Sequence, residues 1–291
     1  MRDWRAAGVL PFLLPPMMSV VAACSPVGLL NTAAPRDGIT TTLGVPYAAG
    51  PRHGLDIYAP SGAGLPVVVF IYGGGWKDGS KSMYRFVGAT LANRGFVTVI
   101  PDYRVFPQVR FPDFLHDTAR AMAWTKANIA AYGGDPNRVS LMGHSAGAHI
   151  AAMLTLDRQW LGTVGMDPDR DINAMIGLSG PYDFLPLHDP ELDLIFAPAG
   201  DLRRTQPIAF ARGDAAPMLL LTGTADTTVY PRNSENLAAR VRADGGRAEV
   251  KEFDGIGHRG IIAAISWPLR WLAPTLVDIV AFFRQYDGRK A

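Results

Sequence analysis

Ser145 lies in the pentapeptide Gly143-His144-Ser145-Ala146-Gly147, a G-x-S-x-G pattern that follows an expected strand and opens an expected helix. A sharp turn between strand and helix exposes the serine hydroxyl, and the glycines leave room for the crowded backbone. The N–H of Ala146 then points out of a helix N-terminus, where negative charge is favoured. The pattern predicts a nucleophilic serine.

A second glycine-rich stretch, Tyr72-Gly73-Gly74-Gly75-Trp76, directly follows the apolar run of residues 66–72. Three consecutive glycines leave several backbone N–H groups unshielded. Such donors can form an oxyanion hole, which stabilises the negative charge that develops on a carbonyl oxygen during acyl transfer.

A catalytic serine needs an imidazole to accept its proton and a carboxylate to orient that imidazole. Of the six histidines, His258 is the best base because it lies in a glycine-rich loop after the expected strand 248–253. Asp226 is the best acid, since it follows the preceding expected strand. The other candidates are less well placed after strand ends: the histidines 53, 116, 144, 149 and 188 and the aspartates 183, 201 and 254.

The elements that must position these residues alternate along the chain. Strands are expected at residues 40–47, 54–59, 66–72, 96–100, 138–142, 174–178, 218–221 and 248–253. Helices are expected at residues 83–94, 114–132, 146–156, 233–243 and 266–285. Alternation of this kind predicts an α/β fold with a mostly parallel central sheet and helices on both faces. Ligand sites in such sheets lie beyond the carboxyl ends of the strands.

The chain order Ser145, Asp226, His258, downstream of the glycine-rich loop, resembles the α/β-hydrolase superfamily. Within it, the carboxylesterases with an HGGG-type oxyanion loop are most similar, including hormone-sensitive-lipase-like esterases and bacterial esterases grouped with bifunctional acetyl-xylan deacetylase/feruloyl esterases. The resemblance runs from about residue 54 to about residue 283, and residues 101–104 (PDYR) and 133–136 (GGDP) support it. It implies a sheet of about eight strands and oxyanion N–H groups from Gly74, Gly75 and Ala146. Tyr72 departs from the family, which often has histidine there.

These features predict a serine carboxylesterase that acts through an acyl-enzyme on a small-molecule ester, without metal or organic cofactor. Residues 181–216 offer only a minimal cap, with helical turns expected near 192–196 and 207–211, so short-acyl or compact aromatic esters are expected. Trp76, Tyr103 and Tyr182 are candidate walls of the substrate pocket. Activity should fall as His258 becomes protonated at acidic pH.

Three other functions fit the same residues. A kynurenine-formamidase-like amidase and an acyltransferase would use the same acyl-enzyme. A non-catalytic binding protein on the same fold is the third alternative, because a fold alone does not determine function.

Composition excludes other classes. With 28 basic and 26 acidic side chains the net charge is +2, and no Lys/Arg run is longer than two residues, so a nucleic-acid partner is not expected. Cys24 is the single cysteine among 291 residues, which excludes a disulfide framework and a cysteine-based metal cage.

The first 23 residues resemble a bacterial lipoprotein signal peptide. Arg2 and Arg5 give a positive start, residues 6–23 carry no charge, and Val21-Ala22-Ala23-Cys24 resembles a lipobox. We therefore expect a signal peptide at 1–23, lipidation of Cys24, a tether at 24–36 and the hydrolase domain at 37–291. The protein is then expected to be exported to the bacterial cell envelope and anchored to a membrane by lipid.

Overall fold

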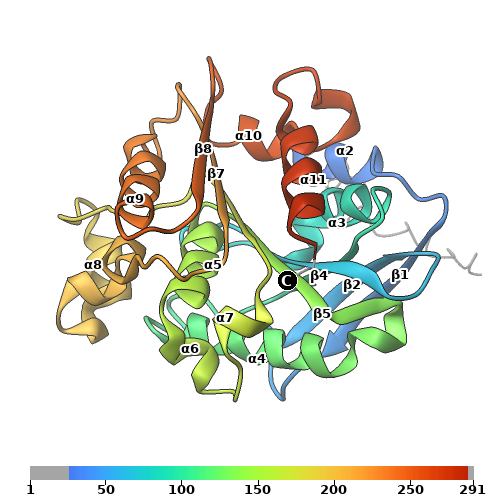
Figure 1. Ribbon diagram of the computed structural model, residues 1–291, viewed down its shortest axis with the longest axis horizontal. Coiled ribbons are helices and arrows are strands. Elements are labelled where there is room, and N and C mark those ends of the chain that lie inside the picture. Colours follow the sequence, from blue (N-terminus) through green and yellow to red (C-terminus); the bar gives the residue numbers. More distant parts are fainter. Residues whose placement is uncertain (1–25, 288–291) are drawn as a thin grey trace, which may run out of the picture.

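The computed structural model of the chain describes residues 26–287. Within this part, one eight-stranded sheet has the strand order β1-β2-β4-β3-β5-β6-β7-β8 (Figure 1). The strands are β1 (Ile39–Pro46), β2 (Gly54–Pro60), β3 (Leu65–Ile71), β4 (Val97–Pro101), β5 (Gly134–His144), β6 (Met175–Leu178), β7 (Met218–Gly223) and β8 (Ala248–Phe253). The β1–β2 and β2–β4 pairs are antiparallel and the others are parallel, which confirms the predicted α/β-hydrolase sheet.

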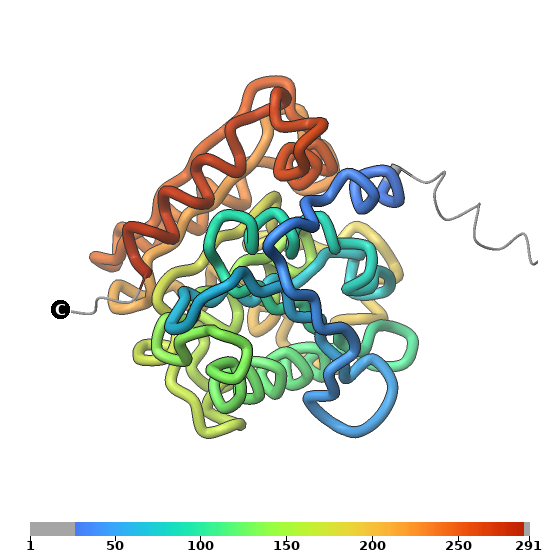
Figure 2. The backbone as a smooth tube through the Cα atoms, turned by 90° about the vertical axis from the view of Figure 1, so that its right-hand side faces the viewer, coloured from blue at the N-terminus to red at the C-terminus, as the bar shows by residue number. Residues whose placement is uncertain are grey.

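Helices cover both faces of this sheet. Helices α3 and α11 lie on one face, and α4, α5 and α9 lie on the other (Figures 1 and 2). The longer helices are α3 (Arg85–Ala92), α4 (Asp113–Asn128), α5 (Ala146–Leu156), α9 (Arg232–Ala243) and α11 (Thr275–Gln285). Short helices α6 (Arg158–Gly162), α7 (Pro168–Asp171) and α10 (Gly260–Ala263) lie in the connections. Because helices shield both faces, the inner strands are almost wholly apolar.

The strand register brings the predicted site residues to one edge. Ile71 of β3 lies opposite Gly143 of β5, and His144 lies opposite Leu178 of β6. Gly223 of β7 lies opposite Phe253 of β8. The loops that follow these parallel strands therefore emerge together at the carboxyl edge of the sheet, which we call the catalytic edge.

The predicted helix 266–285 is wrong in its first half. Residues Trp267–Leu269 form one 3₁₀ turn, and α11 begins only at Thr275. Pro268 and Pro274 explain the break, since proline lacks the N–H that a continuous helix needs and fits only its first turn. Helix 146–156 has the predicted ends, and the other predicted helices are present with shifted ends; residues 81–84 and 129–132, for example, are 3₁₀ turns beside α3 and α4.

The cap between β6 and β7 is as small as predicted. It contains helix α8 (Pro190–Phe196) and three 3₁₀ turns, at Ala197–Ala199, Leu202–Thr205 and Pro207–Phe210. Buried Ile195 and Phe196 attach this segment to the core. The cap therefore covers one side of the catalytic edge without forming a separate domain.

The expected tether is in part a docked helix. Helix α2 (Pro26–Thr32) packs on the domain, where the Asn31 amide donates to the Ser82 carbonyl and accepts from the Phe86 N–H, both at 3.0 Å. Residues 26–32 therefore belong to the folded body. The expected signal peptide and Cys24 lie outside the described residues. In residues 26–287, no helix is both long and apolar enough to cross a membrane.

Candidate active site

The turn at Ser145 is backbone-strained and tightly packed. Ser145 has φ 55° and ψ −125°, an uncommon conformation for a residue with a side chain. A Cβ on Gly143 would lie 2.3 Å from the Gly147 carbonyl oxygen, and one on Gly147 would lie 2.0 Å from that of Ile71. Both glycines are therefore required by close backbone contacts, as the G-x-S-x-G pattern predicts.

Ser145, His258 and Asp226 form one chain of hydrogen bonds. The Ser145 Oγ lies 2.9 Å from His258 Nε2, and the Asp226 Oδ2 lies 2.9 Å from His258 Nδ1. The three side chains come from the loops after β5, β8 and β7. This geometry allows the imidazole to take a proton from the serine while the carboxylate holds the opposite ring nitrogen.

Asp226 is held in its ionised form. Burial alone would raise its pKa, but hydrogen bonds from His258 and the Val229 N–H outweigh this effect and lower the pKa. Its Oδ1 accepts hydrogen bonds from the backbone N–H groups of Thr228 and Val229, at 3.0 and 2.9 Å. The carboxylate is 1% exposed, so these partners fix its position as well as its charge.

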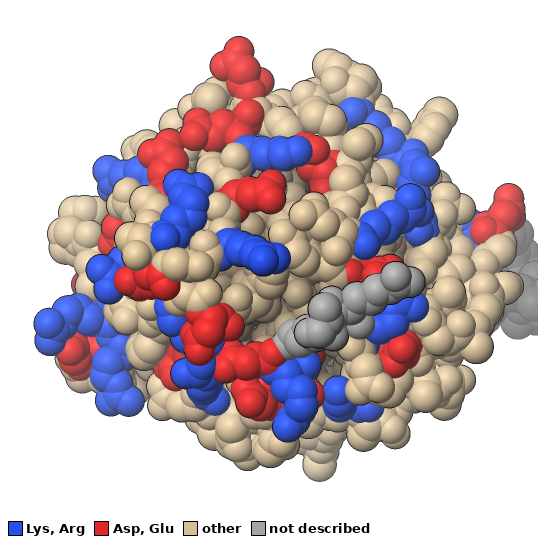
Figure 3. Space-filling model, in the orientation of Figure 1, with Lys and Arg blue, Asp and Glu red and all other residues tan. Residues whose placement is uncertain are grey.

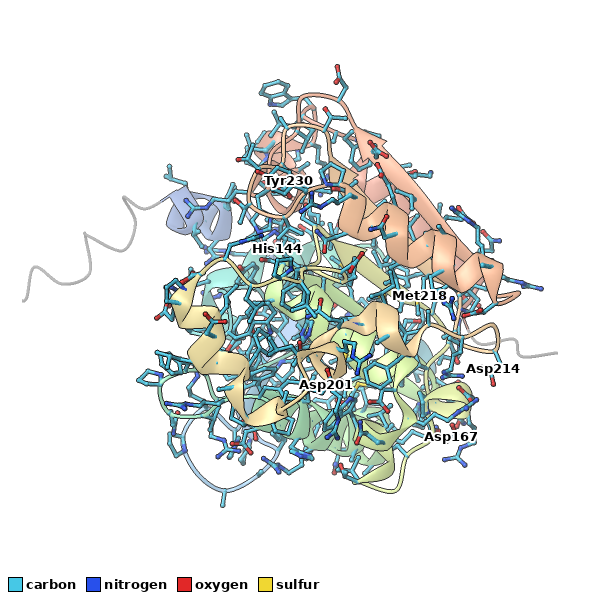
Figure 4. The ribbon with its side chains drawn as sticks, turned by 90° about the vertical axis from the view of Figure 1, so that its left-hand side faces the viewer. His144, Asp167, Asp201, Asp214, Met218 and Tyr230 are labelled. Carbon is cyan, nitrogen blue, oxygen red and sulfur yellow. The ribbon has the colours of Figure 1, made fainter. Side chains whose placement is uncertain are left out.

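The rival acids have partners elsewhere. Asp201 pairs with Arg203 in the cap, well away from His144 at the end of β5 (Figure 4). Asp183 accepts a hydrogen bond from Asn236, and Asp254 accepts one from Thr224.

The rival histidines also have other surroundings. His53 pairs with Asp117, His116 packs on Trp160, and His188 lines a pocket under the cap. His149 accepts a hydrogen bond from Trp76 Nε1 and donates one to the Thr205 carbonyl.

His144 has a positioning contact that the sequence did not predict. Its Nε2 donates to the His258 carbonyl oxygen at 3.0 Å. Burial, then the neighbouring His258, lowers the pKa of His144 to about 3, so the ring is neutral. The residue that precedes the serine thus holds the backbone of the histidine loop. Nothing in the local pattern signals this contact, because the two residues are 114 positions apart.

The glycine-rich loop packs directly on the serine turn. A Cβ on Gly73 would lie 2.8 Å from the His144 carbonyl oxygen, and one on Gly74 would lie 2.1 Å from that of Asp78. Within residues 26–287, the N–H groups of Gly74, Gly75 and Ala146 donate to no protein acceptor. These three donors are therefore available to a ligand oxygen.

Tyr72 braces this loop through its hydroxyl. It donates to Asp102 Oδ1 and accepts from Arg52 Nη2, both at 2.9 Å. Arg52 also donates to the Gly79 carbonyl oxygen at 2.7 Å. Burial, then the neighbouring Tyr103 and Asp102, raises the pKa of Tyr72, so the hydroxyl stays protonated. Tyrosine thus supplies the bracing contacts at the position where the family often has histidine.

None of the three predicted walls lines the pocket described below, and two of them are wholly buried. Tyr103 and Tyr182 are 0% exposed. The Tyr103 hydroxyl donates to the Tyr72 carbonyl oxygen at 2.7 Å, and the Tyr182 hydroxyl lies against Gly177. Both tyrosines therefore form the core. Trp76 is 4% exposed and packs against rings of His149, Phe184 and Phe196.

A pocket of about 340 Å³ lies between the cap and the loop that carries Asp226. Phe184, Leu187 and Leu192 line it from the cap, and Val229 and Tyr230 line it from the other side. The Phe184 ring also stacks on Trp76, with 5.9 Å between centroids. This mostly apolar pocket includes Thr228 and Val229, whose N–H groups hold the Asp226 carboxylate, but none of the three triad side chains lines it. Among the residues that the structure describes, no group of three or more His, Cys, Asp or Glu side chains is arranged to hold a metal ion.

Known proteins are similar to this chain in sequence and fold. The profile of the BD-FAE family matches residues 55–241. Isoprenylcysteine alpha-carbonyl methylesterase ICME of Arabidopsis thaliana is 34% identical over 270 residues, which cover 83% of this chain and 62% of that protein. Esterase LipC of Mycobacterium tuberculosis is 31% identical over 212 residues, 66% of this chain and 52% of LipC. The chain thus spans less than two thirds of these relatives.

Solved structures share the fold. A truncated carbohydrate esterase from gut microbiota has a TM-score of 0.77 at 23% identity, covering 88% of this chain and 99% of the other. The apo form of Thermogutta terrifontis esterase 2 has a TM-score of 0.68 at 24% identity, covering 87% and 95%. The fold, the Ser-Asp-His order and the profile match agree: the chain belongs to the BD-FAE family of α/β hydrolases.

Proposed function

We propose that this protein is a serine carboxylesterase that hydrolyses short-acyl or compact aromatic esters through an acyl-enzyme. The observation that carries the proposal is the 2.9 Å approach of His258 Nε2 to Ser145 Oγ, beside three backbone N–H groups that have no protein acceptor. A non-catalytic protein would have no need to keep these donors open. The names of the relatives also support ester hydrolysis.

In the first step, neutral His258 accepts the Ser145 proton as the serine oxygen attacks the ester carbonyl. The N–H groups of Gly74, Gly75 and Ala146 stabilise the oxyanion that forms, and each such donor typically contributes about 3 kcal/mol. His258 then protonates the leaving alcohol, and Ser145 carries the acyl group.

In the second step, water attacks the acyl-enzyme while His258 accepts its proton. Asp226 keeps the proton of neutral His258 on Nδ1 and stabilises the imidazolium that forms in each step. The acid then leaves, and Ser145 regains its hydroxyl hydrogen from His258.

The small cap supports a preference for compact substrates. The 340 Å³ pocket between the cap and the loop after β7 has room for a short acyl group or one aromatic ring, and Leu192 of α8 forms part of its wall. The similar carbohydrate esterase points to an acylated sugar as one substrate class. The methylesterase relatives point to a methyl ester as a second class.

The test is a substrate panel run with the full chain, Ser145→Ala and the surface control Ser82→Ala. The panel contains nitrophenyl esters of increasing chain length, acetylated and feruloylated sugars, an isoprenylcysteine methyl ester and formyl-kynurenine. We expect hydrolysis of acetyl or aromatic esters that Ser145→Ala abolishes and Ser82→Ala retains. A preference for formyl-kynurenine would replace the esterase proposal by the formamidase, and transfer to an added alcohol in preference to water would replace it by the acyltransferase.

We also propose that Cys24 carries the lipid that anchors the exported protein in the bacterial cell envelope. The support is the position of the single cysteine directly after Val21-Ala22-Ala23. Mass spectrometry of the exported protein should find a diacylglyceryl thioether on Cys24, absent from Cys24→Ser. An unmodified Cys24 in the exported chain would contradict the proposal.

A further inference from the structure

The segment that leads into α11 exposes two tryptophans. Trp267 is 69% exposed and Trp271 is 77% exposed, and Val277 on α11 is 68% exposed. Few other large apolar side chains in the described part of the chain reach such values; Leu29 of α2 is one of them, at 61%. Exposed tryptophan pairs are costly in water, so their grouping points to a partner that covers them.

Three arginines surround an apolar pocket on the same face. The pocket has a volume of about 340 Å³; Leu276, Val277 and Val280 form part of its wall, and Arg94, Arg270 and Arg284 lie at its sides. We call the tryptophans 267 and 271, Val277 and the three arginines the α11 face.

The arginines of the α11 face have no carboxylate partner within residues 26–287. Arg284 donates to the Arg94 carbonyl oxygen and Arg270 to the Ile265 carbonyl oxygen, both at 3.4 Å. Burial, then the neighbouring Arg94, lowers the pKa of Arg270. Like charges are thus held near one another on a partly buried surface, and an anion placed among them would relieve this repulsion.

Some arginines elsewhere in residues 26–287 form ion pairs with carboxylates. Arg104 and Arg120 pair with Asp117, and Arg158 and Arg212 pair with Asp169. Figure 3 shows this contrast, since blue and red side chains alternate on the left of the molecule while blue gathers with little red at the upper right, where Figure 1 places α11. What distinguishes the α11 face is that three arginines without a carboxylate partner in the described part of the chain line one pocket.

The α11 face lies beside the point where the N-terminal chain joins the fold. Helix α2 lies next to the segment before α11 in both views (Figures 1 and 2). Cys24 precedes α2 by two residues. Exposed Leu29 therefore extends the apolar part of this side of the molecule toward the predicted lipid attachment.

We propose that the α11 face binds the surface of a bilayer that contains anionic lipids. Tryptophan rings prefer the boundary between headgroups and acyl chains, and arginines bind lipid phosphates in two-point contacts. A protein partner would supply carboxylates at fixed positions, whereas a bilayer supplies many anions and an apolar layer together. This binding uses side chains of the folded domain and does not depend on acylation of Cys24.

Binding of the α11 face to a bilayer would fix the orientation of the catalytic edge relative to the membrane surface. Trp267 follows His258 by nine residues, and only α10 and one turn lie between them. The bilayer would therefore contact the segment that follows the loop of the proposed base.

The test uses the full chain with Cys24→Ser throughout, so that no acyl chain contributes. Binding is measured by co-sedimentation with vesicles of phosphatidylcholine alone or mixed with phosphatidylglycerol, and tryptophan depth by quenching with brominated lipids. We expect binding to the anionic vesicles and quenching that Trp267→Ala/Trp271→Ala removes. Arg94→Gln/Arg270→Gln/Arg284→Gln keeps the tryptophans and should weaken binding at least about tenfold, given roughly 1 kcal/mol for each arginine near an anionic surface.

The matched control is Leu43→Ala/Leu194→Ala, which removes two comparably exposed apolar side chains elsewhere, 53% and 50% exposed. Hydrolysis of a soluble ester and thermal melting establish that each variant is folded. Equal binding by the parent, the tryptophan variant and the arginine variant would overturn the proposal. So would a dimer in solution that the tryptophan substitutions dissociate, since the α11 face would then bind a second copy.

Discussion

The catalytic edge and the α11 face differ in whether their charged side chains have partners. At the catalytic edge, Asp226 accepts from His258 and from two backbone N–H groups, so its charge has a partner in each direction. At the α11 face, Arg94 and Arg270 line one pocket without a carboxylate partner in the described residues. Proton transfer requires each polar atom of the site to be held in a fixed position. A surface that binds many anions can instead leave its arginines without fixed carboxylate partners.

The largest expected effect is at the catalytic edge. His258→Ala should lower kcat by about 10⁴-fold or more, because Ser145 then lacks a base. His116→Ala is the control, since His116 packs on Trp160 and belongs neither to the triad nor to the proposed substrate pocket. Steady-state kinetics on a nitrophenyl ester compare the two. Similar losses in both variants would mean that the edge depends on general packing and not on one imidazole.

Gly74→Ala should reduce kcat by about 10²- to 10³-fold, because the loop must shift and the N–H of residue 74, which alanine keeps, then no longer points at the oxyanion. Gly74 has φ 143°, and an added Cβ would strike the Asp78 carbonyl oxygen. Gly62→Ala is matched in backbone conformation, since Gly62 has φ 137° before β3, although an added Cβ there would meet only the Leu65 side chain, at 3.3 Å. Both variants should lose stability in a denaturant titration, but only Gly74→Ala should lose kcat. A retained kcat in Gly74→Ala would show that the oxyanion rests on other donors.

Tyr72→Phe tests the brace behind the oxyanion loop. Removing the hydroxyl leaves Arg52 and Asp102 without their common partner, which should cost about 1–3 kcal/mol in the free energy of unfolding. The loop should also become less well positioned, so kcat should fall while KM changes little. Urea unfolding and kinetics measure the two effects, and a variant with unchanged stability and kcat would show that ring stacking alone holds the loop.

The smallest expected effect is a pH dependence of stability. Burial lowers the pKa of His144 to about 3 and that of His149 to about 4, from 6.5. As the pH falls below 6.5, the unfolded chain binds protons that the folded chain excludes, so both histidines stabilise the fold above this pH and less below it.

The free energy of unfolding should fall by up to about 1.4 kcal/mol per pH unit for each histidine. Urea titrations between pH 7 and pH 5 measure this slope. His149→Gln should reduce the slope of the free energy of unfolding against pH by about the contribution of one proton. Arg270→Gln on the α11 face should leave this slope unchanged. A slope that His149→Gln does not alter would contradict the assignment.

The sequence predicts the catalytic edge better than the surfaces around it. Strand ends and the G-x-S-x-G turn are local patterns, so the positions of Ser145, Asp226 and His258 follow from them. The contacts of Tyr72 with Arg52 and Asp102 join residues 20 and 30 positions apart, and no local pattern encodes them. Tyr103 and Tyr182 follow strand ends, where pocket residues are expected. Their burial in the core depends on the packing of the whole fold, so the local sequence does not predict it.

Proline explains the clearest error in the elements. The apolar residues between 266 and 285 have helical spacing, but Pro268 and Pro274 divide the segment. The resulting turn displays Trp267 and Trp271 outward instead of packing them on the sheet.

The most direct test of the proposed chemistry is labelling with a fluorophosphonate, followed by peptide mass spectrometry. This probe reacts with an activated serine and does not leave again. We predict one adduct, on Ser145, formed rapidly in the parent chain, slowly in His258→Ala and not at all in Ser145→Ala. An adduct on another residue, or ester hydrolysis by Ser145→Ala at the parent rate, would contradict the proposed role of Ser145.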